Sequence, residues 1–194
     1  MVEPALKQAL FTYEEYLAVE AASPERHIYW DGEIYAMAGA SVWHTTLETN
    51  LVGLLGTALK GGPCRPLVGN QRLRAPDSDR AVYADATVVC GPPVMHPQDR
   101  DALSNPTVIV EVLSKSTEAF DRGDKFTYYR SFPTLRVVVL VSQKAERVEC
   151  YRRGERGVWS LHDLGADDVL DLPEVGASVA LRDLYAGTED LDLA

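Results

Sequence analysis

The run VIVEVL, residues 108–113, places a carboxylate inside a stretch that is otherwise entirely apolar. A short run of this kind, rich in β-branched residues, is typical of a buried strand. Glu111 would therefore lie in the core, where a carboxylate without a partner costs several kcal/mol. A chain that folds around this strand must bring something cationic to Glu111.

The N-terminal part of the chain carries two strong local signals. Thr12 and Glu15 form a capping box at the start of a predicted helix over residues 12–22. The dipeptide Asp31–Gly32 separates two β-type runs, which predicts a hairpin over residues 27–37. If this hairpin stands off the domain, it exposes alternating Ile, Trp, Ile and Tyr side chains; the alternative is that it packs on the chain's own helices.

The remaining elements alternate between helical and strand patterns. Leucines at helical spacing predict a helix from Ser41, as its cap, to Gly61, as its stop, and Ser116 or Thr117 would cap a helix that ends before Pro133. Short strands are expected at 64–70, 71–75, 81–90 and 107–113, a loop at 91–99, a β-meander at 135–142, 146–153 and 157–164, and a short helix at 179–187. This order predicts an α+β (mixed α/β) fold with a central mixed sheet flanked by helices, in one domain spanning residues 1–194.

Composition limits the class of protein. With 46% hydrophobic and 25% charged residues the chain is globular, and no apolar run approaches the roughly 20 residues of a membrane span. The N-terminus lacks the pattern of a signal peptide. Cys64, Cys90 and Cys150 are odd in number and contain no CxxC pair, which argues against a disulfide framework or structural zinc. We expect a soluble cytoplasmic protein with no membrane partner.

The net charge bears on possible partners. A formal charge of −10 counts against nonspecific binding to phosphate backbones. The acid is concentrated near the C-terminus, however, while Arg65, Arg72, Arg74 and Arg80 lie close together in the sequence. A local basic edge on an acidic protein therefore stays open, and nucleic acid is disfavoured without being excluded.

Two predicted strands each contain one acid among apolar residues, Asp85 and Glu111. On neighbouring strands, the two carboxylates could project from one face and share a divalent cation, for which Mg²⁺ or Mn²⁺ is the suitable choice. Lys125 lies four residues after Asp121 on the following helix and could orient or deprotonate a water, or stabilise charge on a phosphoryl group. The alternative is that the acids are satisfied by hydrogen bonds or arginines, and that Lys125 is an exposed partner of Asp121.

The chain resembles a known family at these residues. The stretches YWDGEIYAMAGAS, VYADATVVCGPP, NPTVIVEVLSKST, FDRGDKFTYYR and RVVVLVS, with the helix around His44, are similar to the Uma2 family of restriction endonuclease-like proteins, within the PD-(D/E)XK nuclease superfamily. The resemblance runs from about Tyr13 to Tyr185. It implies a restriction-endonuclease-like core with an added hairpin and a C-terminal β-meander.

The resemblance also implies roles for individual residues. Asp85 and Glu111 would be the acids of the two half-motifs, and the backbone carbonyl of Val112 a further metal ligand. Ala84 replaces the usual proline before Asp85, and Leu113 stands where the superfamily has its lysine. The resemblance implies that the lysine has moved to the following helix, where Lys125 fits that role, and Lys115 is a second candidate.

Three further polar residues are weaker candidates. His44, near a helix start, is either a phosphate-contacting or catalytic group or a capping or core residue. Glu48, one turn later, could add an acid to the site. Gln71 could line a cleft or lie on a solvated edge.

These residues predict a Mg²⁺- or Mn²⁺-dependent endonuclease that hydrolyses DNA phosphodiester bonds. Because cleavage of both strands of a duplex usually needs two sites, we expect a homodimer. The alternative is a catalytically inactive protein of the nuclease fold that acts as a nucleic-acid-binding or regulatory dimer.

Overall fold

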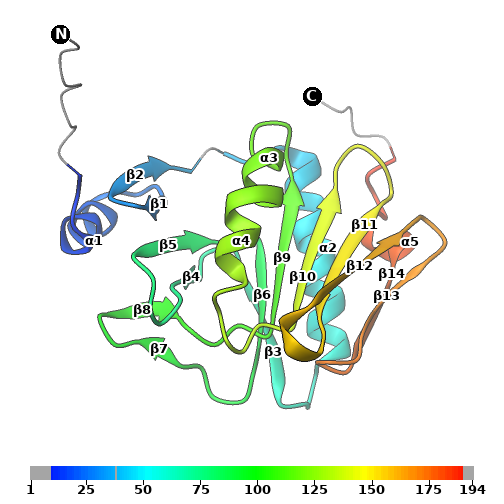
Figure 1. The fold of residues 1–194 in the computed structure, drawn as a ribbon. Helices are drawn as coiled ribbons and strands as arrows, with labels where there is room; N and C mark the ends of the chain where they lie inside the picture. The colour runs from blue at the N-terminus through cyan, green and yellow to red at the C-terminus, as the bar shows by residue number, and fades with distance from the viewer. Residues whose placement is uncertain (1–9, 38, 190–194) are drawn as a thin grey trace, which may run out of the picture.

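The computed structural model describes residues 10–37 and 39–189. Its strands form two six-stranded sheets, in the orders β2-β1-β5-β4-β8-β7 and β12-β11-β10-β9-β6-β3, and a separate hairpin, β13-β14. This is the mixed α/β fold predicted from the sequence (Figure 1). The elements are α1 (Tyr13–Ala22), β1 (His27–Trp30), β2 (Glu33–Ala36), α2 (Val42–Ala58), β3 (Cys64–Val68), β4 (Arg72–Leu73), β5 (Arg80–Tyr83), β6 (Ala86–Cys90), β7 (Met95–His96), β8 (Asp99–Leu103), β9 (Val108–Leu113), α3 (Glu118–Phe120), η1 (Asp121–Lys125), α4 (Phe126–Tyr129), β10 (Val137–Ser142), β11 (Val148–Arg153), η2 (Glu155–Gly157), β12 (Trp159–Leu164), β13 (Val169–Leu172), β14 (Ala177–Ala180) and α5 (Leu181–Leu184).

Strand β9 lies in the middle of the β12-β11-β10-β9-β6-β3 sheet, parallel to β10 and antiparallel to β6. All six of its residues are buried. Val108, Val110 and Val112 pack in the cluster that contains the leucines of α2, whereas Ile109 and Leu113 pack in the cluster that contains the aromatic residues of α4. Alternate side chains of a strand point to opposite faces. Glu111 therefore lies on the α4 face of the sheet, where Tyr129 contacts it.

The segment that follows β9 is a helix interrupted by a π-helical turn. Three residues of α-helix, α3, lead into the π turn η1, and the α-helix resumes as α4. The amide of Phe126 donates to the carbonyl of Asp121, five residues back. Single π turns inside α-helices are frequent at functional sites. This turn contains Asp121 and Lys125, both buried.

The β2-β1-β5-β4-β8-β7 sheet contains the N-terminal hairpin and strand β5, which leads into β6. The hairpin predicted at Asp31–Gly32 is present, with both residues at positive φ, as the tight two-residue turn requires. Strand β1 also pairs with β5, and Trp30 packs against Phe120 and Tyr128. The hairpin thus packs on the chain's own elements, which was the alternative to a hairpin that stands off the domain.

The side-chain caps predicted for the first two helices are both confirmed. Thr12 and Glu15 form the capping box of α1, and Ser41 caps α2 through the amide of His44. The three strands of the predicted meander are β10, β11 and β12, paired in sequence order. Among the described helices, none is long and apolar enough to cross a membrane.

The strand expected at 81–90 is divided between β5 and β6, which belong to different sheets, and three further sequence-based expectations were wrong. The loop expected at 91–99 contains β7 and the first residue of β8, which pair as a hairpin. A second hairpin, β13-β14, precedes the short C-terminal helix. Both were missed because their strands are short and interrupted by proline or acid.

The third error concerns the cysteines. Cys64 and Cys90 occupy opposite positions on the paired strands β3 and β6 and form a disulfide, and Cys150 is free and buried. The count and spacing of cysteines could not reveal this pairing, because it depends on the register of two strands. The cysteines therefore give no support to a reducing compartment.

Candidate functional site

Asp85 and Glu111 meet at the end of strand β6. The antiparallel ladder of β6 and β9 ends at the pair Ala86–Val110, and Asp85 lies in the bend just before β6, next to this end of the ladder. The amide of Val112 donates to Oδ2 of Asp85 at 2.6 Å. Asp85 was expected inside one strand over residues 81–90, but the structure divides that run into β5 and β6, and Asp85 lies in the bend between them. Strand β9 itself orients the Asp85 carboxylate through the Val112 amide.

The cationic partner of Glu111 is Lys125. The Nζ atom of Lys125 lies 2.8 Å from Oε1 of Glu111, and the hydroxyl of Tyr129 donates to the same oxygen. Burial raises the pKa of Glu111 to about 8; the nearby Lys125 ammonium lowers it, and the charge of Asp85 adds to the rise. Because both contacts are to Oε1, Oε2 is the oxygen left for a further partner.

Lys125 is held between two carboxylates. Besides Glu111, its Nζ lies 3.3 Å from Oδ1 of Asp121. Burial acts to lower the pKa of Lys125, but Glu111, Asp121 and Asp85 outweigh it and raise the pKa, so the ammonium stays charged. The alternative, in which Lys125 is an exposed partner of Asp121, is wrong about exposure: the two residues do pair, but both are buried. Three carboxyl groups around one ammonium leave an excess of negative charge.

His44 contacts Asp85 from the first turn of α2. Its Nε2 lies 3.1 Å from Oδ1 of Asp85, and its Nδ1 lies 3.2 Å from Nε2 of Gln143. With the Gln143 amide in this orientation, Nδ1 is the acceptor and Nε2 carries the proton that reaches Asp85. The hydroxyl of Ser41 donates to Oε1 of Gln143 at 3.3 Å, which holds the amide in place. Asp85 is therefore fixed through both oxygens.

Glu48 completes the acidic cluster. Burial raises the pKa of Glu48, and Asp85 raises it further, while a hydrogen bond from the backbone of Gly69 lowers it. A Cβ added to Gly69 would lie 3.2 Å from Oε1 of Glu48 and 3.3 Å from the carbonyl oxygen of Asp85. The absence of a side chain at Gly69 thus allows the β3–β4 connection to approach both acids.

Two of the weaker candidates lie outside this cluster. Lys115 is exposed and forms no ion pair with any residue that the structure describes. The Nε2 of Gln71 donates to the carbonyl oxygens of Arg72 and Asp101, and Gln71 lines a separate cavity. The structure brings together Asp85, Glu111, Lys125, His44 and Glu48.

Two contacting residues were missed from the sequence. Tyr129 lies four residues after Lys125, which lies four after Asp121, so the spacing of this helix could have pointed to Tyr129. Gln143 follows β10 and reaches His44 across the fold. No local pattern predicts that contact.

The donors suit a hard divalent cation that keeps part of its water shell. Within residues 10–37 and 39–189, no group of three His, Cys, Asp or Glu side chains forms a ready cage. Mg²⁺, however, is usually held by one or two carboxylates, with water and substrate oxygens completing the shell. Asp85, Glu111 and the Val112 carbonyl match that donor set, and the excess negative charge around Lys125 favours a cation.

Comparison with known proteins identifies the family of this chain. The Uma2 family, described as "Putative restriction endonuclease", matches residues 13–182. Two Synechocystis proteins, each named "Uncharacterized protein", are similar: slr1290 is 37% identical over 179 residues, 90% of each chain, and sll1609 is 34% identical over 155 residues, 80% of this chain and 88% of the relative.

A solved structure shares the fold. The crystal structure of "a putative nuclease belonging to DUF820" from Anabaena variabilis superposes with a TM-score of 0.71 at 16% identity, over 90% of this chain and 97% of that one. With a family match over most of its length, this chain belongs to the Uma2 family of restriction endonuclease-like proteins.

Proposed function

We propose that this protein is a Mg²⁺- or Mn²⁺-dependent endonuclease that hydrolyses DNA phosphodiester bonds. The observation that carries the proposal is the convergence of Asp85, Glu111 and Lys125 at the adjoining ends of β6 and β9. Two acids and a lysine at one strand end are the groups that metal-assisted phosphodiester hydrolysis requires. Membership of a family described as "Putative restriction endonuclease" supports the same reaction class.

Each residue has a distinct part in this proposal. Asp85, Glu111 and the Val112 carbonyl would hold the cation, which supplies Lewis-acid stabilisation of the phosphoryl oxygens when bound. Lys125 would orient the attacking water and stabilise negative charge on the phosphoryl group. Tyr129 and Lys125 hold Oε1 of Glu111, while His44 and the Val112 amide hold Asp85.

A cleavage panel tests the activity. The purified protein is incubated with single-stranded, duplex and branched DNA in Mn²⁺, beside Asp85→Ala and the control Asp183→Ala, which removes an exposed acid on α5. We expect cleavage by the wild type and the control and none by Asp85→Ala. Cleavage that survives in Asp85→Ala, or no cleavage of any substrate by a folded wild type, would contradict the proposal.

A second candidate function has one observation in its favour. Lys125 already forms buried ion pairs with Glu111 and Asp121, so the acids are neutralised in part without a metal. A protein of this kind could bind nucleic acid, or act as a regulatory homodimer, without cleaving. Titration calorimetry separates the two, because the nuclease must bind Mn²⁺ at these carboxylates. Light scattering tests the homodimer: a mass near the 21.4 kDa of one chain would contradict it.

A further inference from the structure

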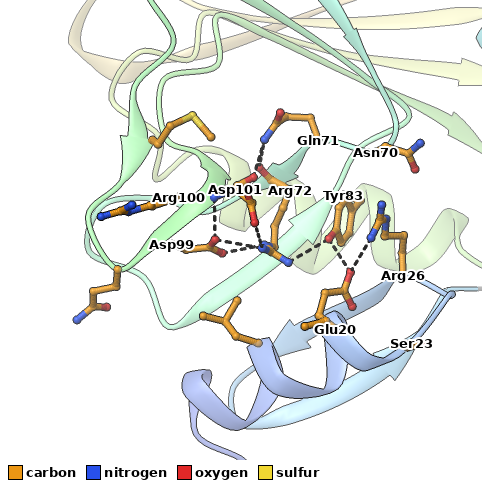
Figure 2. Close-up of a pocket in the computed structure, with 14 residues that line it drawn as sticks. Glu20, Ser23, Arg26, Asn70, Gln71, Arg72, Tyr83, Asp99, Arg100 and Asp101 are labelled. Carbon is orange, nitrogen blue, oxygen red and sulfur yellow. Dashed lines mark hydrogen bonds and ion pairs between the residues drawn. The ribbon is translucent and has the colours of Figure 1, made fainter.

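A cavity of about 740 Å³ lies between α1, strands β4 and β5, and the β7–β8 hairpin (Figure 2). It is joined to the cluster through two segments of chain. Asn70 and Gln71 line the cavity and directly follow Gly69, which approaches Glu48 and Asp85. Tyr83 also lines it and precedes Asp85 by two residues, or about 7 Å of extended chain.

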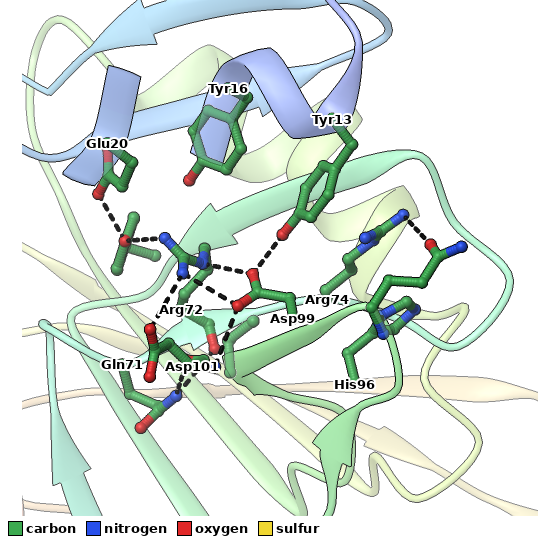
Figure 3. A network of polar contacts seen from close by, with 12 residues as sticks. Tyr13, Tyr16, Glu20, Gln71, Arg72, Arg74, His96, Asp99 and Asp101 are labelled. Atoms are coloured by element: carbon green, nitrogen blue, oxygen red, sulfur yellow. Dashed lines mark hydrogen bonds and ion pairs between the residues drawn. The ribbon is translucent and has the colours of Figure 1, made fainter. Parts of the chain in front are cut away.

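The inner wall of the cavity is a buried polar network. Arg72 donates from Nε and Nη2 to the two oxygens of Asp99, at 2.7 and 3.1 Å (Figure 3). Its Nη1 donates to the hydroxyl of Tyr83 (Figure 2). Tyr83 in turn donates to Oε1 of Glu20 at 2.7 Å. Because these groups satisfy one another, the wall is preformed and presents a fixed surface to whatever enters.

The rim of the cavity, by contrast, offers polar groups that are free to bind. Asn70 and Arg100 are exposed and form no side-chain hydrogen bond with the residues that the structure describes. Arg26 is 46% exposed and makes only one ion pair, at 3.8 Å, with Glu20. Asp101 adds an acceptor that is 89% exposed. Donors and an acceptor therefore surround the opening.

The balance of charge around the cavity limits the chemical class of ligand that it could bind. Three arginines (Arg26, Arg72, Arg100) face three acids (Glu20, Asp99, Asp101) around the cavity, so a polyanion gains little net attraction there. A nucleobase matches better, because its Watson–Crick edge offers both donors and acceptors. In a duplex that edge is already paired and cannot reach the rim.

We propose that this cavity binds an unpaired nucleotide adjacent to the phosphate that is cleaved, so that the preferred substrate is single-stranded or has a frayed or branched segment. The proposal rests on the proposed function for the position of the cleaved phosphate. The volume of the cavity lies within the range of small-molecule pockets and is sufficient for one nucleotide. Asn70 and Arg100 would be specificity-determining residues that contact the base.

Binding measurements test the cavity independently of catalysis. Fluorescence anisotropy in EDTA compares a labelled single-stranded oligonucleotide with the same sequence in a blunt duplex. The variants are Asn70→Ala and Arg100→Ala, with Arg182→Ala as a matched control that removes an 83% exposed arginine on α5. We expect the wild type to prefer the single strand, and each rim variant to weaken that binding about five- to tenfold. The control should change neither affinity.

Each outcome bears on one claim. Equal wild-type affinity for the two forms, no single-strand binding, or rim variants that affect the duplex equally would overturn the cavity proposal. If the rim variants act as expected but the wild type cleaves no DNA in Mn²⁺, the cavity proposal holds and the nuclease proposal fails. If the wild type cleaves and the rim variants bind normally, only the cavity proposal fails.

Discussion

The Nζ of Lys125 lies 2.8 Å from Oε1 of Glu111, with the two side chains only 6% and 3% exposed. This ion pair explains how a carboxylate is tolerated in the central apolar strand. It depends on the π turn in the helix after β9, since that turn brings Lys125 and Asp121 to the sheet. Because the acids of the cluster outnumber its lysine, we expect removal of the lysine and removal of an acid to change the stability of the protein differently.

Removal of Lys125 should destabilise the fold strongly. In Lys125→Met at about pH 9, above the pKa of Glu111, both Glu111 and Asp121 lose their buried cation, and we expect a loss of about 3–5 kcal/mol in the free energy of unfolding. Urea denaturation measures it. The matched control is Lys144→Met, which removes a lysine that is 66% exposed and pairs with Glu118 at the surface; it should cost less than about 1 kcal/mol. Equal effects of the two substitutions would mean that the buried pair contributes no more than the surface pair.

Removal of the Glu111 charge should stabilise the folded protein at pH 8, whereas removal of Lys125 should destabilise it. The folded-state pKa of about 8 lies above the ordinary 4.5, so the unfolded chain binds fewer protons than the folded chain between these values. Stability conferred by the protonated form is therefore present below about pH 4.5 and declines as pH rises to about 8. Glu111→Gln removes this decline. In EDTA we expect the variant to melt above the wild type at pH 8 and near it at pH 4.5, and a wild type that is the more stable at pH 8 would refute the assignment.

Local sequence signals predicted much of the fold, but they did not predict contacts between residues far apart in the sequence. The capping box at Thr12 and the turn at Asp31–Gly32 are set by neighbouring residues, and both were predicted. The Cys64–Cys90 disulfide depends on strand register, so the cysteine count failed to reveal it.

The same distinction holds in the site. Glu111 was conspicuous because its charge conflicts with an apolar strand, and Lys125 was found by its spacing from Asp121. The contact between Gln143 and His44 joins residues 99 apart in the sequence. The burial of Lys125 also had no local signal, since a π turn is set by packing of the whole helix against the sheet.

Gln143 should control the tautomer of His44. Its amide donates to Nδ1, which leaves the proton on Nε2, facing Asp85. In Gln143→Leu the donor is lost and both neutral tautomers become accessible. Nitrogen-15 NMR of the imidazole at neutral to alkaline pH should show Nε2–H predominating in the wild type and a mixture in the variant. An unchanged spectrum would show that Gln143 does not position the ring. His162, on the exposed strand β12, serves as the internal control.

Reduction of the disulfide should lower thermal stability without unfolding the protein. Cys64 and Cys90 are separated by 26 residues, and closing a loop of this length restricts the unfolded chain by about 3–4 kcal/mol. We expect dithiothreitol to lower the melting temperature of the wild type but not that of Cys64→Ser/Cys90→Ser. A thiol assay on the unfolded, unreduced protein should count one free cysteine, because two of the three are bonded. Three free thiols would show that the bond does not form, and the melting temperature would then not respond to the reductant.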